Sequence, residues 1–238
     1  MRRLMYQVPY LHVEETEEEL RVLPFSRSIG GRHESLYIKE PETIAWIDSF
    51  EREDALMLDV GANIGCYTLY ALSRWPSLRV VAVEPHGPSR EKLVENVSLN
   101  GWSDRVTVIG CVLTSAIGKT GFAASAIAGT SDGRIVLGDT HDAMTLDALV
   151  ESLGEMPAYI KIDVDGHEPS VVAGGRETLS RAECLSVLVE LSERAEETDS
   201  MLRACGLMHH PLTLWRNRRD DRNVIYWRGC GLRERPPA

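Results

Sequence analysis

Short apolar runs alternate with amphipathic segments from residue 55 onward. Runs of this length are typical of buried strands, and the segments between them have the spacing of helices that cover a sheet. We expect buried strands at 56–60, 79–83, 106–111, 158–163 and 184–191, and helices at 64–74, 88–100, 145–153, 168–179 and 193–205. The alternation predicts an α/β fold, in which a mostly parallel sheet has helices on both faces.

Three further segments complete the pattern. The closing segments 207–215 and 223–227 are β-like, which predicts an antiparallel pair at the edge of the sheet. Residues 114–133 are rich in Gly, Ala, Ser and Thr without a clear period, so we expect a loop there, followed by an irregular strand around 134–137.

The first 54 residues differ from the rest because they are polar and acidic. Within them, Pro41 precedes apolar residues at helical spacing, among them Ile44 and Trp46, and this predicts a helix that lies against the main domain. We therefore expect an N-terminal cap or lid at 1–54 and a main domain at 55–238.

The chain of 238 residues has a formal net charge of −10, which disfavours nucleic acid as a partner. A protein that grips nucleic acid normally carries many lysines and arginines on one surface. One basic stretch is interrupted by two acids, and we favour a solvated turn over an anion site for it. Its members are Arg216, Arg218, Arg219 and Arg222, with Asp220 and Asp221 between them.

The cysteines and the apolar segments bear on location. The five cysteines are scattered and include no Cys-x-x-Cys pair, so we expect neither a disulfide framework nor a zinc site. The N-terminus lacks the apolar region of a signal peptide, and no segment approaches the ~20 apolar residues that span a bilayer. A cytoplasmic protein without a membrane partner is expected.

A glycine loop joins the first buried strand to the next helix. It reads Asp59-Val60-Gly61-Ala62-Asn63-Ile64-Gly65, so its glycines have the spacing Gly-x-x-x-Gly. Dinucleotide enzymes use Gly-x-Gly-x-x-Gly, and their helix amides hold a diphosphate. An acid at Asp59 would repel a diphosphate, but it suits a ligand with an ammonium and a sulfonium. The loop therefore favours S-adenosylmethionine over NAD, and Asn63 is the side chain that we rank first for the methionine end.

The next strand ends in Val83-Glu84-Pro85, with Glu84 nineteen positions after Gly65. A carboxylate at this strand tip can accept hydrogen bonds from both ribose hydroxyls. We expect Glu84 to bind the ribose, with Pro85 beside it in the cofactor site. The alternative is an ordinary strand-to-helix turn followed by a solvated charge.

A second polar cluster, Asp163-Val164-Asp165-Gly166-His167-Glu168, follows the strand at 158–163. It lies at the carboxyl edge of the sheet, where open α/β folds bind ligands. Methyl transfer to an alcohol needs a base, and histidine needs the least retuning near neutral pH. We expect His167 to be that base, Asp163 to position the acceptor or the methionine end of the cofactor, and Glu168 to be a further catalytic candidate.

Several alternatives stay open here. The carboxylates could hold Mg²⁺ and lower the pKa of the acceptor, which we do not favour because acids close in sequence need not converge in space. Asp165 or His167 could cap the following helix, with Glu168 in its first turn. Glu190 either lines the acceptor pocket or is an ordinary strand-end acid, and Lys161 could be only an inter-strand contact.

Four blocks of this sequence resemble the FkbM-type methyltransferases in order and separation, across roughly residues 40–192. The blocks are 57–68, 83–86, 145–149 and 160–168. The resemblance implies a Rossmann-like class I methyltransferase with a seven-stranded sheet, S-adenosylmethionine as donor, and hydroxyls of polyketides, sugars or cell-surface glycans as acceptors. It also places the reaction edge at 163–168, the ribose at Glu84, and the cofactor loop at Asp59, Gly61, Asn63 and Gly65.

Together these observations predict an S-adenosylmethionine-dependent methyltransferase that acts on a hydroxyl of a polyketide-like secondary metabolite or of a sugar. Its expected partner is a small-molecule or carbohydrate acceptor, and a homodimer is left open. The rival hypotheses are a non-catalytic domain that binds the cofactor or a partner, N-methylation of a small molecule, and an NAD-dependent oxidoreductase, whose glycine spacing is absent.

Overall fold

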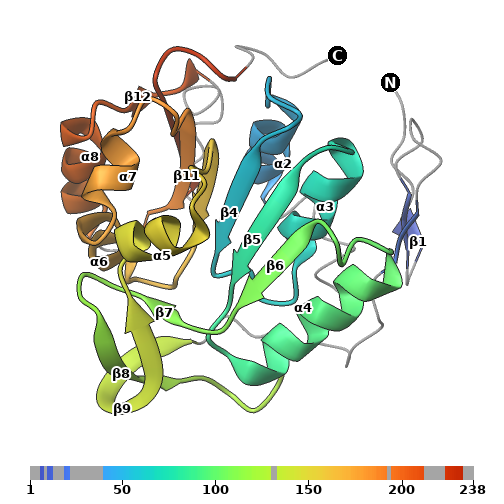
Figure 1. Ribbon diagram of the computed structural model, residues 1–238, viewed down its shortest axis with the longest axis horizontal. Coiled ribbons are helices and arrows are strands. Elements are labelled where there is room, and N and C mark those ends of the chain that lie inside the picture. Colours follow the sequence, from blue (N-terminus) through green and yellow to red (C-terminus); the bar gives the residue numbers. More distant parts are fainter. Residues whose placement is uncertain are drawn as a thin grey trace.

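A seven-stranded sheet forms the centre of the protein (Figure 1). The computed structural model describes residues 40–129, 133–191, 194–211 and 223–232, and the backbone of 6–7, 10–12 and 19–21. In spatial order the strands are β12 (Met208–His209), β13 (Asn223–Trp227), β11 (Ser186–Glu190), β10 (Tyr159–Ile162), β4 (Leu56–Val60), β5 (Arg79–Val83) and β6 (Val106–Ile109). The helices are α2 (Pro41–Asp48), α3 (Cys66–Arg74), α4 (Gly87–Leu99), α5 (Leu146–Leu153), α6 (Glu168–Ala173), α7 (Arg176–Ser180) and α8 (Ala195–Ala204).

The strand directions align the carboxyl ends of the central strands. β11, β10, β4, β5 and β6 pair in parallel, whereas β13 runs antiparallel to both β11 and β12. The predicted mostly parallel sheet and its antiparallel edge pair are therefore confirmed. Part of the predicted strand at 207–215 and the basic stretch at 216–222 fall within 212–222, outside the described residues.

Alternate residues of each central strand pack on opposite faces of the sheet. Met57 belongs to a buried cluster with residues of α2, α3 and α4, while Leu56 and Leu58 belong to a second cluster with residues of α5 to α8. Strands that are buried on both faces read as continuous apolar runs. This double burial is why the short runs of the sequence predict the strands well.

The predicted helix after Pro41 is α2, and it is packed into the core. Trp46 is buried, and its Nε1 donates a hydrogen bond of 2.9 Å to Ser186 Oγ on β11. The ring of Phe50, just after the helix, stacks on Tyr159 of β10 with centroids 3.6 Å apart. Of the predicted cap before this helix, the structure describes three short antiparallel strands, β1 (Tyr6–Gln7), β2 (Tyr10–His12) and β3 (Glu19–Arg21), and Glu40.

The predicted helix at 168–179 is wrong as a single element, because it is divided into α6 and α7. A Cβ on Gly174 would lie 2.2 Å from the carbonyl oxygen of Thr114, so the chain passes this point in close backbone contact. A new helix begins directly afterwards, where Asp147 of α5 accepts hydrogen bonds from the backbone amides of Glu177 and Thr178. The side-chain cap satisfies amides that a continuous helix would have paired internally.

The predicted loop at 114–133 is also corrected, since it contains the strand β8 (Gly118–Ala123). β8 pairs with β9 (Arg134–Met144), which is far longer than the strand expected at 134–137, and β7 (Val112–Leu113) completes a small separate sheet. β9 is mostly exposed, so its sequence lacks the apolar signal of a buried strand. Gly121 allows the close pairing, because a Cβ there would lie 2.5 Å from the carbonyl oxygen of Val136.

No helix among the described residues is both long enough and apolar enough to cross a bilayer.

Candidate active site

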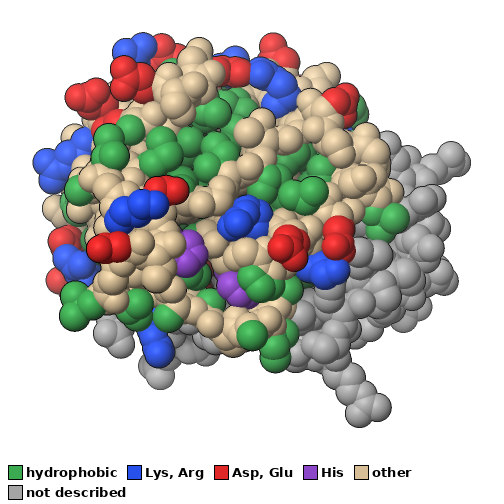
Figure 2. Space-filling view, turned by 60° about the horizontal axis from the view of Figure 1, so that its bottom comes forward, with side chains coloured by type: hydrophobic (Ala, Val, Ile, Leu, Met, Phe, Trp, Pro, Cys, Tyr) green, Lys and Arg blue, Asp and Glu red, His purple; other side chains and the backbone are tan. Residues whose placement is uncertain are grey.

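A crevice opens at the carboxyl ends of β4, β5, β10 and β11, next to the small β7-β8-β9 sheet. It holds about 1170 Å³ of empty space, including the part open to solvent. The predicted site residues that line it are Gly61, Asn63, Glu84, Pro85, Asp163 and His167, whereas Asp59, Gly65 and Glu168 are absent from its lining. Figure 2 brings this edge of the molecule forward and shows acidic and basic side chains interspersed, with no continuous basic stripe on the described part of that face.

The glycine loop is pressed against the turn that follows β10. Gly61 has φ +80°, and a Cβ on it would lie only 1.8 Å from the carbonyl oxygen of Asp163. Its amide donates to the carbonyl oxygen of Val83 at 2.9 Å, and the amide of Asp163 donates to that of Val60 at 3.0 Å. Because Gly61 has no side chain, the glycine loop and the turn after β10 can lie in direct backbone contact.

Glu84 lies at the tip of β5, where its carboxylate joins the loop to the next helix. Its Oε2 accepts a hydrogen bond from the backbone amide of Asn63, and its Oε1 accepts one from that of His86, both at 2.8 Å. Burial raises the pKa of Glu84 to about 7, and the two amides and the nearby Arg90 partly counteract this. A carboxylate offers about four acceptor positions, so Glu84 can still accept hydrogen bonds from a ligand in the crevice.

Asp59 lies beneath the loop and not in the crevice. Its Oδ2 accepts a 2.6 Å hydrogen bond from the hydroxyl of Thr68 on α3, and the side chain is 1% exposed. Burial raises the pKa of Asp59, while the charge of Lys161 opposes the rise. Gly65 also has a structural position: it is the N-cap of α3, and its φ of +87° is a backbone conformation that favours glycine. Neither residue lines the crevice, so each can influence a cofactor there only through the shape or the charge of the loop.

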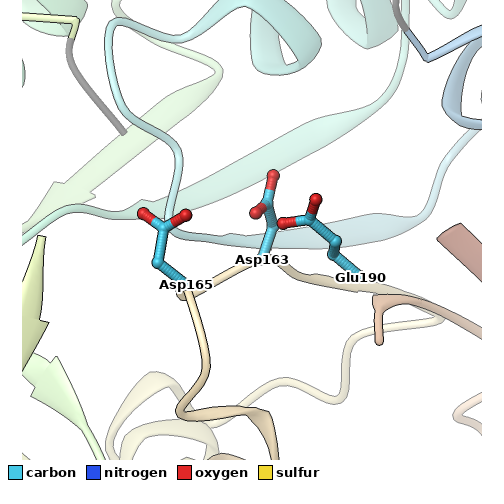
Figure 3. A group of neighbouring side chains, drawn as sticks. All are labelled: Asp163, Asp165 and Glu190. Atoms are coloured by element: carbon cyan, nitrogen blue, oxygen red, sulfur yellow. The ribbon is translucent and has the colours of Figure 1, made fainter. Parts of the chain in front are cut away.

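Three carboxylates converge at the carboxyl ends of β10 and β11. Asp163, Asp165 and Glu190 each offer an oxygen, and these oxygens lie within 4.8 Å of one another. Figure 3 shows the carboxylates of Asp163 and Glu190 pointing toward each other, with Asp165 on the adjacent turn. Of the two readings for Glu190, a place in the crevice is the one that the structure bears out.

Lys161 is the residue of this cluster whose importance the sequence reading missed. It is 1% exposed, and its Nζ donates a 2.6 Å hydrogen bond to Asp163 Oδ2. The ammonium also lies 5.0 Å from the ring centroid of Tyr67 on α3. A charged residue in an otherwise apolar buried strand is rare without a partner. The lysine at position 161 could therefore have indicated a buried ion pair from the sequence.

His167 and Glu168 have different surroundings. His167 lines the crevice at the start of α6, and burial lowers its pKa. Glu168 is 1% exposed and turned inward, where its Oε1 accepts a 2.9 Å hydrogen bond from the backbone amide of Gly166. Glu168 therefore holds the turn that carries His167, and the geometry gives no support to the catalytic role predicted for it.

Other lining residues come from segments that the sequence did not connect to the site. Glu40 precedes α2, and Phe122 and Arg134 belong to the β8-β9 pair. None of them follows a strand of the central sheet, so the rule that ligands bind at strand ends could not find them. They line the same crevice as the residues at the ends of the central strands.

Comparisons with known proteins agree with this geometry. The methyltransferase FkbM domain matches residues 59–210. The chain is 32% identical over 171 residues to the hexuronic acid methyltransferase AglP of Haloferax volcanii, which is 67% of this chain and 65% of AglP. It is 49% identical over 63 residues to the AMB antimetabolite synthetase AmbE of Pseudomonas aeruginosa, which is 26% of this chain and 3% of AmbE. The chain thus spans less than two thirds of the length of either curated relative.

Among solved structures, the methyltransferase FkbM of Methylobacillus flagellatus aligns with a TM-score of 0.49 and 21% identity, over 74% of this chain and 44% of that one. The domain match covers more than half of the chain, and it contains the glycine loop, Glu84 and the acidic cluster after β10. The chain belongs to the FkbM methyltransferase family.

Proposed function

We propose that this protein transfers a methyl group from S-adenosylmethionine to a hydroxyl of a sugar or of a small secondary metabolite. The observation that carries the proposal is the contact between the glycine loop and the turn after β10, with Glu84 at the tip of the neighbouring strand. The contact puts the predicted cofactor site and the predicted reaction edge in one crevice.

The side chains of the crevice fit this donor by charge and by hydrogen-bonding capacity. Glu84 retains acceptor positions for the ribose hydroxyls. The acids in the lining exceed the cations, which suits a donor that carries a sulfonium and an ammonium; they are Glu40, Glu84, Asp163, Asp165 and Glu190. When it is bound, S-adenosylmethionine supplies an electrophilic methyl group. The protein has to hold the acceptor oxygen in line with it and exclude bulk water.

The charge of the lining also bears on the acceptor. Among the described lining residues the cations are Lys161, which is already paired with Asp163, and Arg134 on β9. This balance favours a neutral hydroxylated acceptor. The similarity to a hexuronic acid methyltransferase supports a sugar, and Arg134 is the residue that an acidic sugar would contact.

We propose a mechanism without a divalent cation. Three carboxylates within 4.8 Å have a spacing that Mg²⁺ can use. However, the ammonium of Lys161 already neutralises Asp163, and it would repel a second cation at the same place. If a chelator abolished the activity and Mg²⁺ restored it, the mechanism would depend on a divalent cation.

Two measurements test the proposed function. Calorimetry should detect binding of S-adenosylmethionine, and NAD should give no heat. Radiolabelled methyl transfer should then be measured with methyl glucoside, methyl glucuronide and a hydroxylated macrolide, with an amine panel to detect N-methylation. Binding without transfer to any acceptor would favour the non-catalytic alternative. A cytoplasmic location belongs to the same proposal and can be checked by cell fractionation.

A further inference from the structure

Glu190 and Asp163 form a carboxyl pair at the edge of the crevice. Glu190 ends β11 and Asp163 follows β10, two strands that pair in parallel. Their carboxylates point toward each other, with oxygens that lie within 4.8 Å of one another (Figure 3). A carboxyl–carboxyl hydrogen bond needs a proton, so one of the two groups carries it whenever the bond is formed.

The position of Lys161 decides which group carries the proton. Its buried ammonium donates to Asp163 Oδ2 at 2.6 Å, and this contact favours the ionised form of Asp163. Glu190 is half-buried and forms no such ion pair with the residues that the structure describes. The proton of the pair is therefore held mainly by Glu190, and it is Glu190 that releases and regains it.

We propose that Glu190 is the catalytic base of the methyl transfer, and that the Lys161–Asp163 ion pair orients it. This inference rests on the proposed function. In the step, the ionised carboxylate of Glu190 accepts the proton of the acceptor hydroxyl. The acceptor oxygen forms a bond to the methyl carbon while the carbon–sulfur bond breaks, and that electron pair goes to sulfur. The products are the methyl ether, neutral S-adenosylhomocysteine and protonated Glu190, which returns its proton to solvent.

The charges around Glu190 give this base a distinctive pH dependence. Burial, and then the nearby charge of Asp163, raise the pKa of Glu190 to about 8. In the described part of the chain, the polar groups that face it are Glu40 before α2, Lys161 and Asp163 on the β10 side, Asp165 on the following turn, and Asn223 opposite it on β13. The rate should therefore rise between pH 7 and 9. If His167 were the base, the inflection of the rate would lie below pH 6.5, because burial lowers the pKa of His167 from that value.

The first experiment needs no acceptor. Carboxyl carbons of glutamate are labelled with ¹³C, and their resonances are followed by NMR as the pH is raised. One resonance should titrate near pH 8 in the wild-type protein and be absent from Glu190→Gln. The control Glu183→Gln, an exposed acid before β11, should keep that resonance. If Glu190 titrates near its usual value of about 4.5, the proposal is overturned.

The second experiment measures single-turnover methyl transfer to whichever of the three acceptors named above is used. Glu190→Gln should lower the rate about 10²–10⁴-fold and remove the inflection near pH 8. His167→Ala should keep that inflection, and the affinity for S-adenosylmethionine should persist in both variants. If His167→Ala removes the pH dependence and Glu190→Gln does not, His167 is the base. Absence of heat with S-adenosylmethionine, in contrast, would contradict the proposed function itself.

Discussion

The contact between the glycine loop and the turn after β10 predicts a large effect for the substitution Gly61→Ala. An L-residue at φ +80° costs roughly 1–2 kcal/mol. The added Cβ would lie 1.8 Å from the carbonyl oxygen of Asp163, and ordinary contact begins at 3.4 Å, so the two segments must separate by about 1.6 Å. This separation also strains the 3.0 Å hydrogen bond between the amide of Asp163 and Val60, which is worth about 1 kcal/mol.

We therefore expect Gly61→Ala to lower the free energy of unfolding by about 3–6 kcal/mol, since overpacking adds about 1–3 kcal/mol to the costs of the backbone strain and the hydrogen bond. Gly65→Ala is the matched control. Gly65 has a similar φ of +87°, but the nearest atom to its Cβ is Cγ of Leu93 at 3.1 Å, a side chain that can move. Its cost should stay near the roughly 1–2 kcal/mol of the backbone strain alone.

Urea unfolding followed by circular dichroism measures both free energies, and calorimetry measures the affinity for S-adenosylmethionine in the folded variants. In Gly61→Ala the dissociation constant should rise more than about tenfold, because the loop is displaced. Equal midpoints and equal slopes for the two alanine variants would refute the reasoning, since the loop would then tolerate a Cβ as readily at Gly61 as at Gly65.

The remaining predictions concern single side chains of the crevice. Glu84→Gln should weaken S-adenosylmethionine about 10–100-fold in calorimetry, because hydrogen bonds to a charged acceptor are worth about 1.5–3 kcal/mol; an unchanged affinity would remove Glu84 from the ribose site. Lys161→Met leaves Asp163 and the buried Asp59 without their shared cation and should cost about 3–5 kcal/mol in urea unfolding. Phe122→Ala should raise KM for the acceptor and leave the affinity for the donor unchanged, because Phe122 lines the crevice from the β8-β9 pair and not from the glycine loop; a change in donor affinity alone would contradict this expectation. Burial raises the pKa of Glu84 to about 7 and that of Glu190 to about 8, above the usual 4.5, so the protonated forms favour the folded state. The stability that they contribute is complete below pH 4.5 and is lost as the pH rises through 7 to 8; unfolding at pH 6 and 9 should show this fall, and it should be smaller in Glu190→Gln.

The parts of the fold that the sequence predicts are those determined locally. β4 and β5 cover the predicted 56–60 and 79–83, because both strands are buried on both faces and leave an unbroken apolar signal. The end of α6 and the strand β8 were not predictable in this way. Each depends on close contact with a residue distant in sequence, Thr114 at Gly174 and Val136 at Gly121.

Much of the site, by contrast, could be predicted from the two-residue alternation of side chains along the strands. Side chains alternate between the two faces of a sheet, and Met57, Ala82, Tyr159 and Leu188 all face the cluster that contains α3. The residues two positions later therefore share that face at the carboxyl ends of four adjacent strands; they are Asp59, Glu84, Lys161 and Glu190. The strand order and this alternation together explain why one cation meets several acids there. Asp163, Asp165 and His167 lie beyond the end of β10, where the alternation no longer applies. The turn that carries them is held against Gly61 through the carbonyl of Asp163, a contact that the sequence alone does not reveal. From the sequence, His167 is favoured as the base only because the ordinary pKa of a histidine lies near neutral pH.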